Sequence, residues 1–372
     1  MTDTLSLTAV VGGTGTTGCA YLVRHVLQCR EEKPIGLITS RHSFVGHKQL
    51  QPLSLQQNRL LEVLGSMKKQ QCTHVVLTLP PSSIASGEAE GLMLDTAIVA
   101  GLAGEGLEPL HAWLRTHARR LVCNLDEEGS RALARRWQGT CLTYGENRIE
   151  ADLSGKNLRL LPGKSVFAAL TRQELIPVEL SAFGGYEMYQ ALPAMACGLL
   201  SGVPLERSAR ALAHPPVIPG RVELLHGSEG ERVLIDSAAT PEALENLLYT
   251  ARSVTPGSLL LVMDAPEQGT RAFRQELGRV CTMADRTYLT ANDPSDPAAQ
   301  RLCREMQSGM EEHRLSGLVM PDRSRAIHCA MQRCGAKDTL VLSGRGDRLT
   351  ARCGGREIPF DERALLRRYL VT

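Results

Sequence analysis

The glycine-rich segment Val10–Gly18, which reads VVGGTGTTG, constrains the fold of this chain more than any other feature. An apolar, β-rich run, Leu7–Val11, leads into it, and a helical pattern near Cys19–Cys29 follows it. A strand, a glycine turn and a helix in this order bring backbone N–H groups and the positive end of a helix dipole to one point. The segment therefore predicts an α/β unit whose first turn is able to meet a phosphate group.

Strand-like and helix-like segments alternate along most of the 372 residues, which predicts mostly parallel sheets covered by helices. Strands are expected at Leu7–Val11, Ile35–Thr39, His74–Leu79, Leu158–Leu161, Glu179–Phe183, Arg232–Asp236, Ser258–Met263, Arg286–Thr290 and Thr339–Leu342. Helices are expected near Cys19–Cys29, Leu60–Lys69, Met188–Leu200, Pro241–Arg252, Arg271–Met283 and Arg323–Arg333. The proline-rich stretch Ala213–Arg221 predicts a linker, so we expect a first α/β domain at 1–215 and a smaller one at 216–372.

Composition excludes several classes of protein. The 42 basic and 40 acidic residues leave a net charge of only +2, so no overall field favours nucleic acid or an anionic membrane. No apolar run reaches the roughly 18 residues of a membrane span, and no signal peptide is evident, so a cytoplasmic location is expected. The 11 cysteines are scattered without a C-x-x-C pair, which argues against a zinc ribbon and a disulfide framework.

One interpretation of the loop is dinucleotide binding. Gly13, Gly15 and Gly18 satisfy the G-x-G-x-x-G pattern, but that fold expects an acidic residue about 20 positions later to hold the ribose. Arg41 stands near that place instead. An arginine would suit a 2′-phosphate, so the local pattern leaves an NADP-binding oxidoreductase open.

A second interpretation is a phosphate loop, which needs a lysine for the terminal phosphates and then a hydroxyl for Mg²⁺. Those two positions hold Cys19 and Ala20. A third interpretation is structural, because the glycines would also allow a tight strand-to-helix turn without any ligand.

The rest of the chain resembles the Mur ligase family, segment after segment in the same order. Thr14–Ala20 is similar to the family loop T-G-T-N-G-K-T, and Asn124–Gly129 to its N-x-D-D segment. The matching segments also include Pro34–Thr39, Thr73–Ser83, Glu90–Val99, Tyr189–Ala196, Pro219–Glu223, Asp236–Leu244, Leu289–Pro294 and Asp338–Asp347. Among these segments, Pro219–Glu223, Asp236–Leu244 and Leu289–Pro294 most resemble the branch that adds the third amino acid to the UDP-muramoyl dipeptide.

This resemblance implies a central P-loop-like ATPase domain with a mostly parallel sheet, followed by a smaller Rossmann-like domain. It covers nearly the whole chain but not the family's N-terminal, UDP-binding domain, which we expect to be absent. ATP and Mg²⁺ are the cofactors that it implies, in a peptidoglycan-related, acid–amino acid ligase reaction.

Several residues that the family uses for this chemistry are replaced here. Lysine and threonine of the loop become Cys19 and Ala20, and a metal-binding carboxylate and a nearby histidine become Thr78 and Ser82. Further replacements fall at Glu105, Gly106, His117, Ser237, Ala239 and Ser295. We therefore assign no catalytic residue and no metal site, and treat the loop Gly13, Thr14, Gly15, Thr16, Thr17, Gly18, Cys19 and Ala20 as a degenerate nucleotide site.

The expected function is that of a catalytically impaired Mur-ligase-like protein acting as a binding or regulatory partner. Its ligand would be a small carboxylate or amino acid, and its partner another protein rather than nucleic acid or a membrane. The polar residues expected to contact a ligand are Asn124, Asp126, Arg221, Asp236, Asn292 and Arg345. The alternative is an active ATP-dependent amide ligase with a rearranged site; an NADP-binding oxidoreductase is the third hypothesis.

Overall fold

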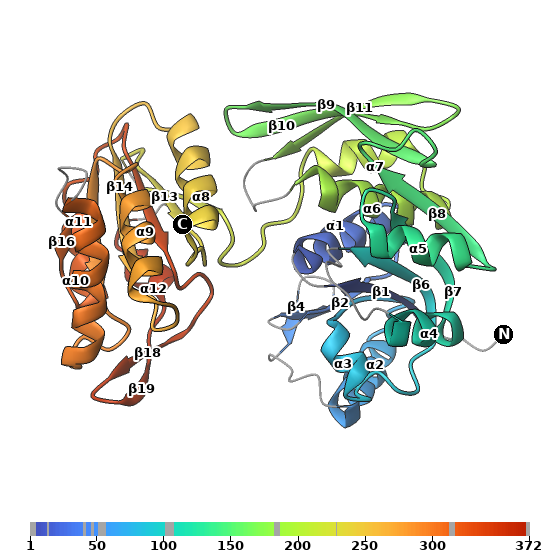
Figure 1. Ribbon diagram of the computed structural model, residues 1–372, viewed down its shortest axis with the longest axis horizontal. Coiled ribbons are helices and arrows are strands. Elements are labelled where there is room, and N and C mark those ends of the chain that lie inside the picture. The colour runs from blue at the N-terminus through green and yellow to red at the C-terminus, as the bar shows by residue number, and fades with distance from the viewer. Residues whose placement is uncertain are drawn as a thin grey trace. The chain divides into compact units, whose positions relative to one another are not determined.

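The computed structural model describes residues 5–12, 15–39, 42–45, 48–50, 57–100, 108–181, 187–227, 229–311 and 317–369. The chain divides into two compact units whose main boundary falls between Pro216 and Val217. That boundary lies inside the proline-rich stretch Ala213–Arg221. Figure 1 shows helices and a sheet in each unit, and we describe each unit by itself.

Unit 1 is built on an eleven-stranded sheet in the order β11-β10-β9-β8-β7-β6-β1-β5-β2-β3-β4. The pairs among β2, β5, β1, β6, β7, β8 and β9 are parallel, whereas β2–β3, β3–β4 and β10–β11 are antiparallel. The strands are β1 (Ser6–Gly12), β2 (Gly36–Ile38), β3 (Ser43–Val45), β4 (Lys48–Leu50), β5 (His74–Leu79), β6 (Leu94–Ala100), β7 (Ala118–Asn124), β8 (Thr140–Gly145), β9 (Leu153–Leu161), β10 (Lys164–Leu170) and β11 (Leu175–Ser181).

Helices cover both faces of the parallel part of this sheet. They are α1 (Thr16–Gln28), α2 (Gln57–Lys69), α3 (Pro81–Ala85), α4 (Glu108–His117), α5 (Glu128–Arg136), α6 (Met188–Leu200) and α7 (Leu205–Leu212). Leu7, Ala9 and Val11 of β1 share one buried cluster with side chains of α2, α4 and α5. Helices α1 and α6 pack against each other on the opposite face. Alternating β1 residues therefore enter two cores, as expected for a strand buried on both sides.

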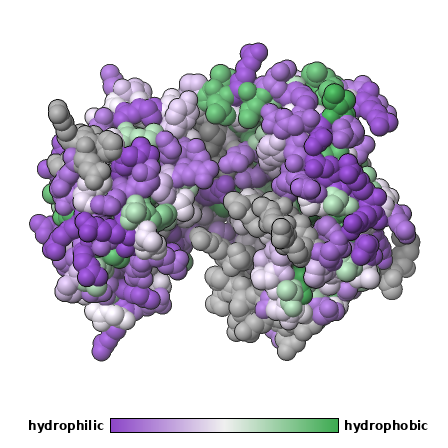
Figure 2. Space-filling view, viewed as in Figure 1, coloured by the Kyte–Doolittle hydropathy of each residue, from purple (hydrophilic) through white to green (hydrophobic). Residues whose placement is uncertain are grey.

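Part of the surface of the extension β9–β11 is apolar. Figure 2 shows apolar surface over this extension, to which the exposed residues Leu158, Leu160, Leu170 and Leu175 belong.

Unit 2 has a six-stranded sheet in the order β12-β13-β17-β14-β15-β16, with only β12 antiparallel to its neighbour. Its strands are β12 (Glu223–His226), β13 (Arg232–Ile235), β14 (Leu259–Asp264), β15 (Arg286–Thr290), β16 (Leu318–Val319) and β17 (Thr339–Ser343), with a separate hairpin of β18 (Thr350–Cys353) and β19 (Arg356–Pro359). Its helices are α8 (Pro241–Ser253), α9 (Arg271–Cys281), α10 (Pro297–Glu311), α11 (Arg323–Met331) and α12 (Glu362–Leu366). One face packs on α8, α9 and α10 and the other on α11 and Leu366 of α12.

The predicted α/β class with mostly parallel sheets is thus confirmed. Three elements match residue for residue: β5, α6 and β15. The helix expected to reach Arg333 ends at Met331, and the strand expected at Glu179–Phe183 is β11, which starts earlier, at Leu175, while 182 and 183 lie outside the described residues. Among the described residues no helix is long and apolar enough to cross a bilayer, and the cysteines are free thiols.

Candidate functional site

The glycine loop joins β1 to α1 at the carboxyl edge of the sheet in unit 1. Gly15 caps α1 in the left-handed conformation, with φ of 82° and no side-chain capping bond. Gly12 lies so close to β6 that a Cβ there would fall 1.6 Å from the carbonyl oxygen of Ala100. Gly13 and Thr14 are outside the described residues. The described part of the loop therefore consists of the end of β1, Gly15 in the left-handed conformation and the N-terminal turn of α1.

The loop glycines face a side chain from α6. A Cβ on Gly18 would lie 2.3 Å from Oε1 of Gln190, and a Cβ on Gly15 would lie 3.4 Å from Nε2 of the same residue. Gln190 is 5% exposed, and its Oε1 has no hydrogen-bond partner among the described residues. The absence of a side chain at Gly18 thus leaves room for Gln190 of α6, and Gly15 adopts a positive φ, so packing and backbone conformation suffice to explain these two glycines.

The two residues after Gly18 point into the protein. Cys19 is 1% exposed and Ala20 is 0% exposed. Burial, and to a smaller degree Cys197 nearby, raises the pKa of the Cys19 thiol, so at neutral pH it is uncharged. The described loop, including Thr16 and Thr17, therefore offers backbone N–H groups but no side-chain cation.

Three further replaced positions in unit 1 lie on described elements near the sheet. Thr78 is a buried residue of β5 and Ser82 lies in the short helix α3. His117 ends α4 with its ring stacked 4.4 Å from that of Trp113. Glu105 and Gly106 lie outside the described residues. The described residues contain no cluster of three or more histidine, cysteine or carboxylate side chains able to hold a metal ion.

Asn124 and Asp126 bind neighbouring chain segments at the ends of β7 and β8. Asn124 accepts a hydrogen bond from the Asp126 amide at 3.0 Å. Asp126 accepts from the amide of Asn147 at 3.1 Å and from the Tyr189 hydroxyl at 2.9 Å. Burial and then Asp126 raise the pKa of Tyr189, so its hydroxyl stays protonated and donates. These bonds join the end of β8 to the start of α6.

At the start of unit 2, Asp236 fixes the chain after β13. Its carboxylate accepts from the amides of Val222 at 2.7 Å and Ala238 at 2.6 Å. Burial raises the pKa of Asp236, although those amides and Arg221 favour its ionised form. Gly220 lies against the loop after β17, because a Cβ there would fall 2.2 Å from the amide nitrogen of Asp347.

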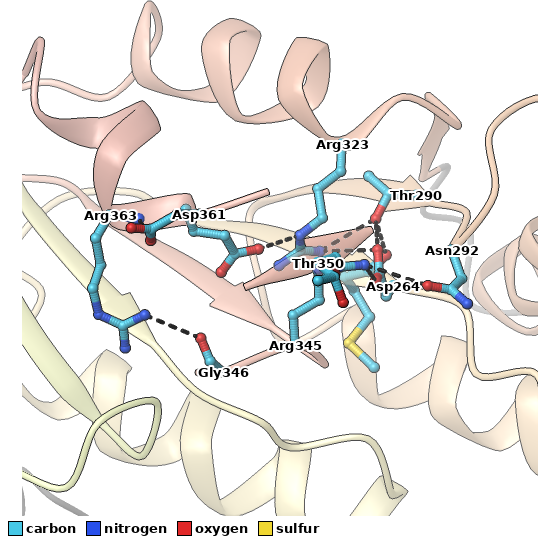
Figure 3. Close-up of polar contacts among 11 residues, drawn as sticks. Asp264, Thr290, Asn292, Arg323, Arg345, Gly346, Thr350, Asp361 and Arg363 are labelled. Atoms are coloured by element: carbon cyan, nitrogen blue, oxygen red, sulfur yellow. Dashed lines mark hydrogen bonds and ion pairs between the residues drawn. The ribbon is translucent and has the colours of Figure 1, made fainter. Parts of the chain in front are cut away.

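The densest group of charges lies at the carboxyl edge of the sheet in unit 2 (Figure 3). Asp264, at the end of β14, contacts Arg323 Nη1 through Oδ1 at 3.2 Å and Arg345 Nη1 through Oδ2 at 3.1 Å. Arg323 Nε lies 2.5 Å from Oε1 of Glu362, and all four side chains are 9% exposed or less. Thr290 donates its hydroxyl to Asp264. We call Asp264, Arg323, Arg345 and Glu362 the buried charge network.

This network is electrically balanced, with two guanidinium groups and two carboxylates. Burial alone would raise the pKa of Asp264, but Arg323 and Arg345 outweigh it and hold that pKa below its ordinary value. Arg345 also lies 5.1 Å from the ring centre of Phe360. Because each charge has a partner, the network carries no surplus positive charge to attract a phosphate.

Hydrogen bonds also hold the segment after β15. Asn292 donates to Glu267 at 2.7 Å, and its Oδ1 lies 3.4 Å from Arg345. Asp293 accepts from the Ser295 hydroxyl at 2.6 Å and from the amide of Gly355, in the β18–β19 turn, at 2.7 Å. These bonds lower the pKa of Asp293 to about 2.

The structure thus accounts for the described candidate residues by contacts within each unit. In unit 1 the structure brings Gln190 to the loop residues Gly15, Gly18, Cys19 and Ala20. The sequence did not point to Gln190, because it lies in a small-residue helix far along the chain. In unit 2 the structure brings Arg345 and Asn292 together, with Asp264, Arg323 and Glu362, which were not predicted. Asp264 could have been predicted, because it is a carboxylate at the end of the apolar strand Leu259–Asp264.

Comparison with known proteins finds similarity to Mur ligases. Residues 220–346 match the family model described as Mur ligase, glutamate ligase domain. The chain is 25% identical over 382 residues to the UDP-N-acetylmuramoyl-L-alanyl-D-glutamate–2,6-diaminopimelate ligase of Halalkalibacterium halodurans, covering 97% of this chain and 77% of that protein. The enzyme of the same name from Bacillus cereus is 25% identical, over 100% of this chain and 79% of its own length.

Solved structures agree on the fold. A structure of a UDP-N-acetylmuramoyl-L-alanyl-D-glutamate–2,6-diaminopimelate ligase superposes with a TM-score of 0.72 and 20% identity, covering 98% of this chain and 78% of that one. The MurF ligase of Thermotoga maritima in complex with ADP gives a TM-score of 0.61 with 16% identity, covering 92% of this chain and 77% of that one. Residues 220–346 thus carry the Mur ligase C-terminal domain, and the chain as a whole has the fold of these ligases.

Proposed function

We propose that this chain is a Mur-ligase-like binding protein that keeps the ligase fold but does not drive amide formation with ATP. In this account it acts by binding a small carboxylate or amino acid, or a protein partner such as an authentic ligase. The names of its relatives and the match over residues 220–346 support the ligase-like part of the proposal.

The observation that carries the proposal is the burial of Cys19 and Ala20 at the position of the family's phosphate-binding lysine and threonine. Phosphoryl transfer depends on positive charge held where negative charge develops. Cys19 is uncharged and 1% exposed, and Ala20 has no hydroxyl. Removing one such electrostatic group typically costs about 10²- to 10³-fold in rate, and here Thr78 replaces a carboxylate as well. The described residues therefore do not fit ATP with Mg²⁺ in the family's manner.

A second candidate is an active amide ligase with a rearranged site. The observation that favours it is the extent of the similarity, which spans 97% of this chain in a relative named as a ligase. The third hypothesis, an NADP-binding oxidoreductase, gains no support, because the relatives described above are ligases and Arg41 lies outside the described residues.

Nucleotide-dependent melting separates these candidates. A ligand at 100 times its dissociation constant stabilises the folded state by about 2.7 kcal/mol, which is a clear shift in melting temperature. We expect no shift with 5 mM ATP and Mg²⁺, and none with NADP; the Bacillus cereus relative, treated identically, is the positive control. A shift with ATP that requires Mg²⁺ would favour the ligase, and one with NADP alone would favour the oxidoreductase.

A further inference from the structure

A polar cavity of about 380 Å³ opens at the amino edge of the sheet in unit 1. Its lining residues lie where β1 and β5 begin and where α1 and α6 end. Gly12, where β1 enters the glycine loop, is six residues beyond Ser6, so the two regions are about 20 Å apart at 3.3 Å per residue. The cavity is thus separate from the loop, and its size is within the range of small-molecule sites.

Two arginine side chains line this cavity with more donors than the protein uses. Arg30 donates from Nη1 to the carbonyl oxygen of Ser201. Arg120 donates to the carbonyl oxygens of Leu200 at 2.6 Å and Asp95 at 3.3 Å. A guanidinium carries five N–H groups in a planar fork, so each side chain keeps donors beyond those that hold the end of α6. A planar anion such as a carboxylate matches this fork.

Uncharged polar groups complete the lining. Thr73 contributes a buried hydroxyl with no hydrogen-bond partner among the described residues. The His74 ring bonds to the Thr8 hydroxyl at 2.8 Å through Nε2. Burial lowers the pKa of His74 to about 4, so the ring is neutral at pH 7. The uncharged lining therefore adds polarity to the cavity without adding a charge.

The charges around the cavity select among anions. Arg30 and Arg120 give two positive charges and Glu31 one negative charge, while Asp95 is paired with Arg119 at 3.3 Å. The carboxyl ends of α1 and α6, which carry partial negative charge, also lie here. The two helix ends together add about one further negative charge, so the cavity as a whole is close to neutral. A neutral site with separate positive and negative groups suits a zwitterion better than a dianion.

We propose that this cavity binds a small molecule of amino-acid size through a single carboxylate, held by Arg30 and Arg120. The carboxylate lies between the two guanidinium groups. Glu31 and the carbonyl groups at the helix ends are placed to accept from a ligand ammonium group. This site deepens the proposed function, on which it rests, by placing the small carboxylate ligand. Binding here does not depend on the glycine loop, so a failed titration would leave the prediction about ATP untouched.

Calorimetric titration of the full chain at pH 7 tests the site, with L-alanine, acetate and inorganic phosphate as probes. We expect L-alanine to bind with a dissociation constant of about 1 mM or tighter, acetate more weakly, and phosphate not at all. Phosphate binding tighter than L-alanine, or no heat from either carboxylate at 10 mM, would overturn the proposal.

Variants locate the binding. Arg30 is exposed, so Arg30→Gln should fold normally and weaken L-alanine binding at least tenfold, because a charge-assisted hydrogen bond is lost. Arg120→Gln should weaken it as much, with its melting temperature recorded because Arg120 also holds the end of α6. Arg210→Gln, which removes an exposed arginine of α7 paired with Glu206, is the matched control and should bind normally. Unchanged affinity in Arg30→Gln would contradict the assignment.

Discussion

The carboxyl edges of the two sheets are both formed where parallel strands end, but neutral groups fill one and paired charges fill the other. In unit 1 the strand-to-helix turn is lined by neutral groups, with Cys19 and Ala20 buried and Gln190 lying against the glycines. In unit 2 the corresponding edge holds the buried charge network, in which Asp264 contacts two arginines. Ligands of α/β proteins usually bind at the carboxyl ends of the strands. Here one such edge is occupied by neutral side chains and the other by ion pairs, so the two edges should respond differently to mutation.

The largest effect should follow from placing a charge in the neutral edge. Cys19→Lys puts an ammonium group into a site that is 1% exposed, where a lysine pKa falls by about 3–5 units, a cost of about 4 kcal/mol or more. Both tryptophans, Trp113 and Trp137, lie in unit 1, so their fluorescence during urea unfolding reports on this unit. Cys19→Met, whose new side chain is about as long as lysine but uncharged, should lower the free energy of unfolding much less. A fully stable Cys19→Lys protein that gains ATP binding would refute the burial account.

The next largest effect should come from removing a charge from the other edge. Asp264→Asn leaves Arg323 and Arg345 without their shared carboxylate in a buried place, which should destabilise unit 2 by about 3 kcal/mol. Hydrogen exchange of peptides from β14 and β17 measures this locally. Glu276→Gln, which breaks an exposed pair with Arg279, should change the free energy of opening obtained from exchange by less than about 1 kcal/mol. Equal effects of the two substitutions would mean that the network contributes nothing beyond a surface pair.

A smaller effect should follow from adding a methyl group to the loop. Gly18→Ala brings a Cβ within 2.3 Å of Gln190 Oε1, and overpacking of this kind costs about 2 kcal/mol. Adding Gln190→Ala should recover part of that loss, which a double-mutant cycle would detect. Gly65→Ala in α2 has no atom within 4 Å of the new Cβ, so it should be neutral or stabilising. If the double mutant shows no coupling, the two side chains do not compete for this space.

The smallest effect should be a pH dependence confined to unit 2. The pKa of Asp293 is lowered to about 2 by its bonds to Ser295 and Gly355, against about 3.9 in an unfolded chain. A depressed carboxyl pKa stabilises the fold above about pH 4 and loses that contribution as pH falls toward 2. The protection of the β18–β19 amides, taken relative to their intrinsic exchange rates, should therefore fall over this interval and become less pH-dependent in Asp293→Asn. A carboxyl titration of Asp293 near 4 by NMR would show that the bonds are not maintained in solution.

Local patterns predicted much of the fold but only part of the sites. The apolar run of β5, the small-residue run of α6 and the alternation of strands and helices depend on near neighbours, so the sequence reveals them. Gln190 could not be predicted, because its contact with Gly18 depends on how α6 packs against α1. The pairing of Arg345 with Asp264 joins residues 81 positions apart, so Arg345 was predicted as a ligand contact, whereas the structure places it in an ion pair.

The central claim, that the neutral edge of unit 1 does not activate a carboxylate with ATP, is tested most directly by turnover. The purified chain would be incubated with ATP, Mg²⁺, the UDP-muramoyl dipeptide and 2,6-diaminopimelate, as well as with free amino acids, and the products followed by phosphate release and mass spectrometry. We predict neither phosphate nor amide product above the level of a sample without protein. Formation of an amide in step with ATP consumption would contradict the account.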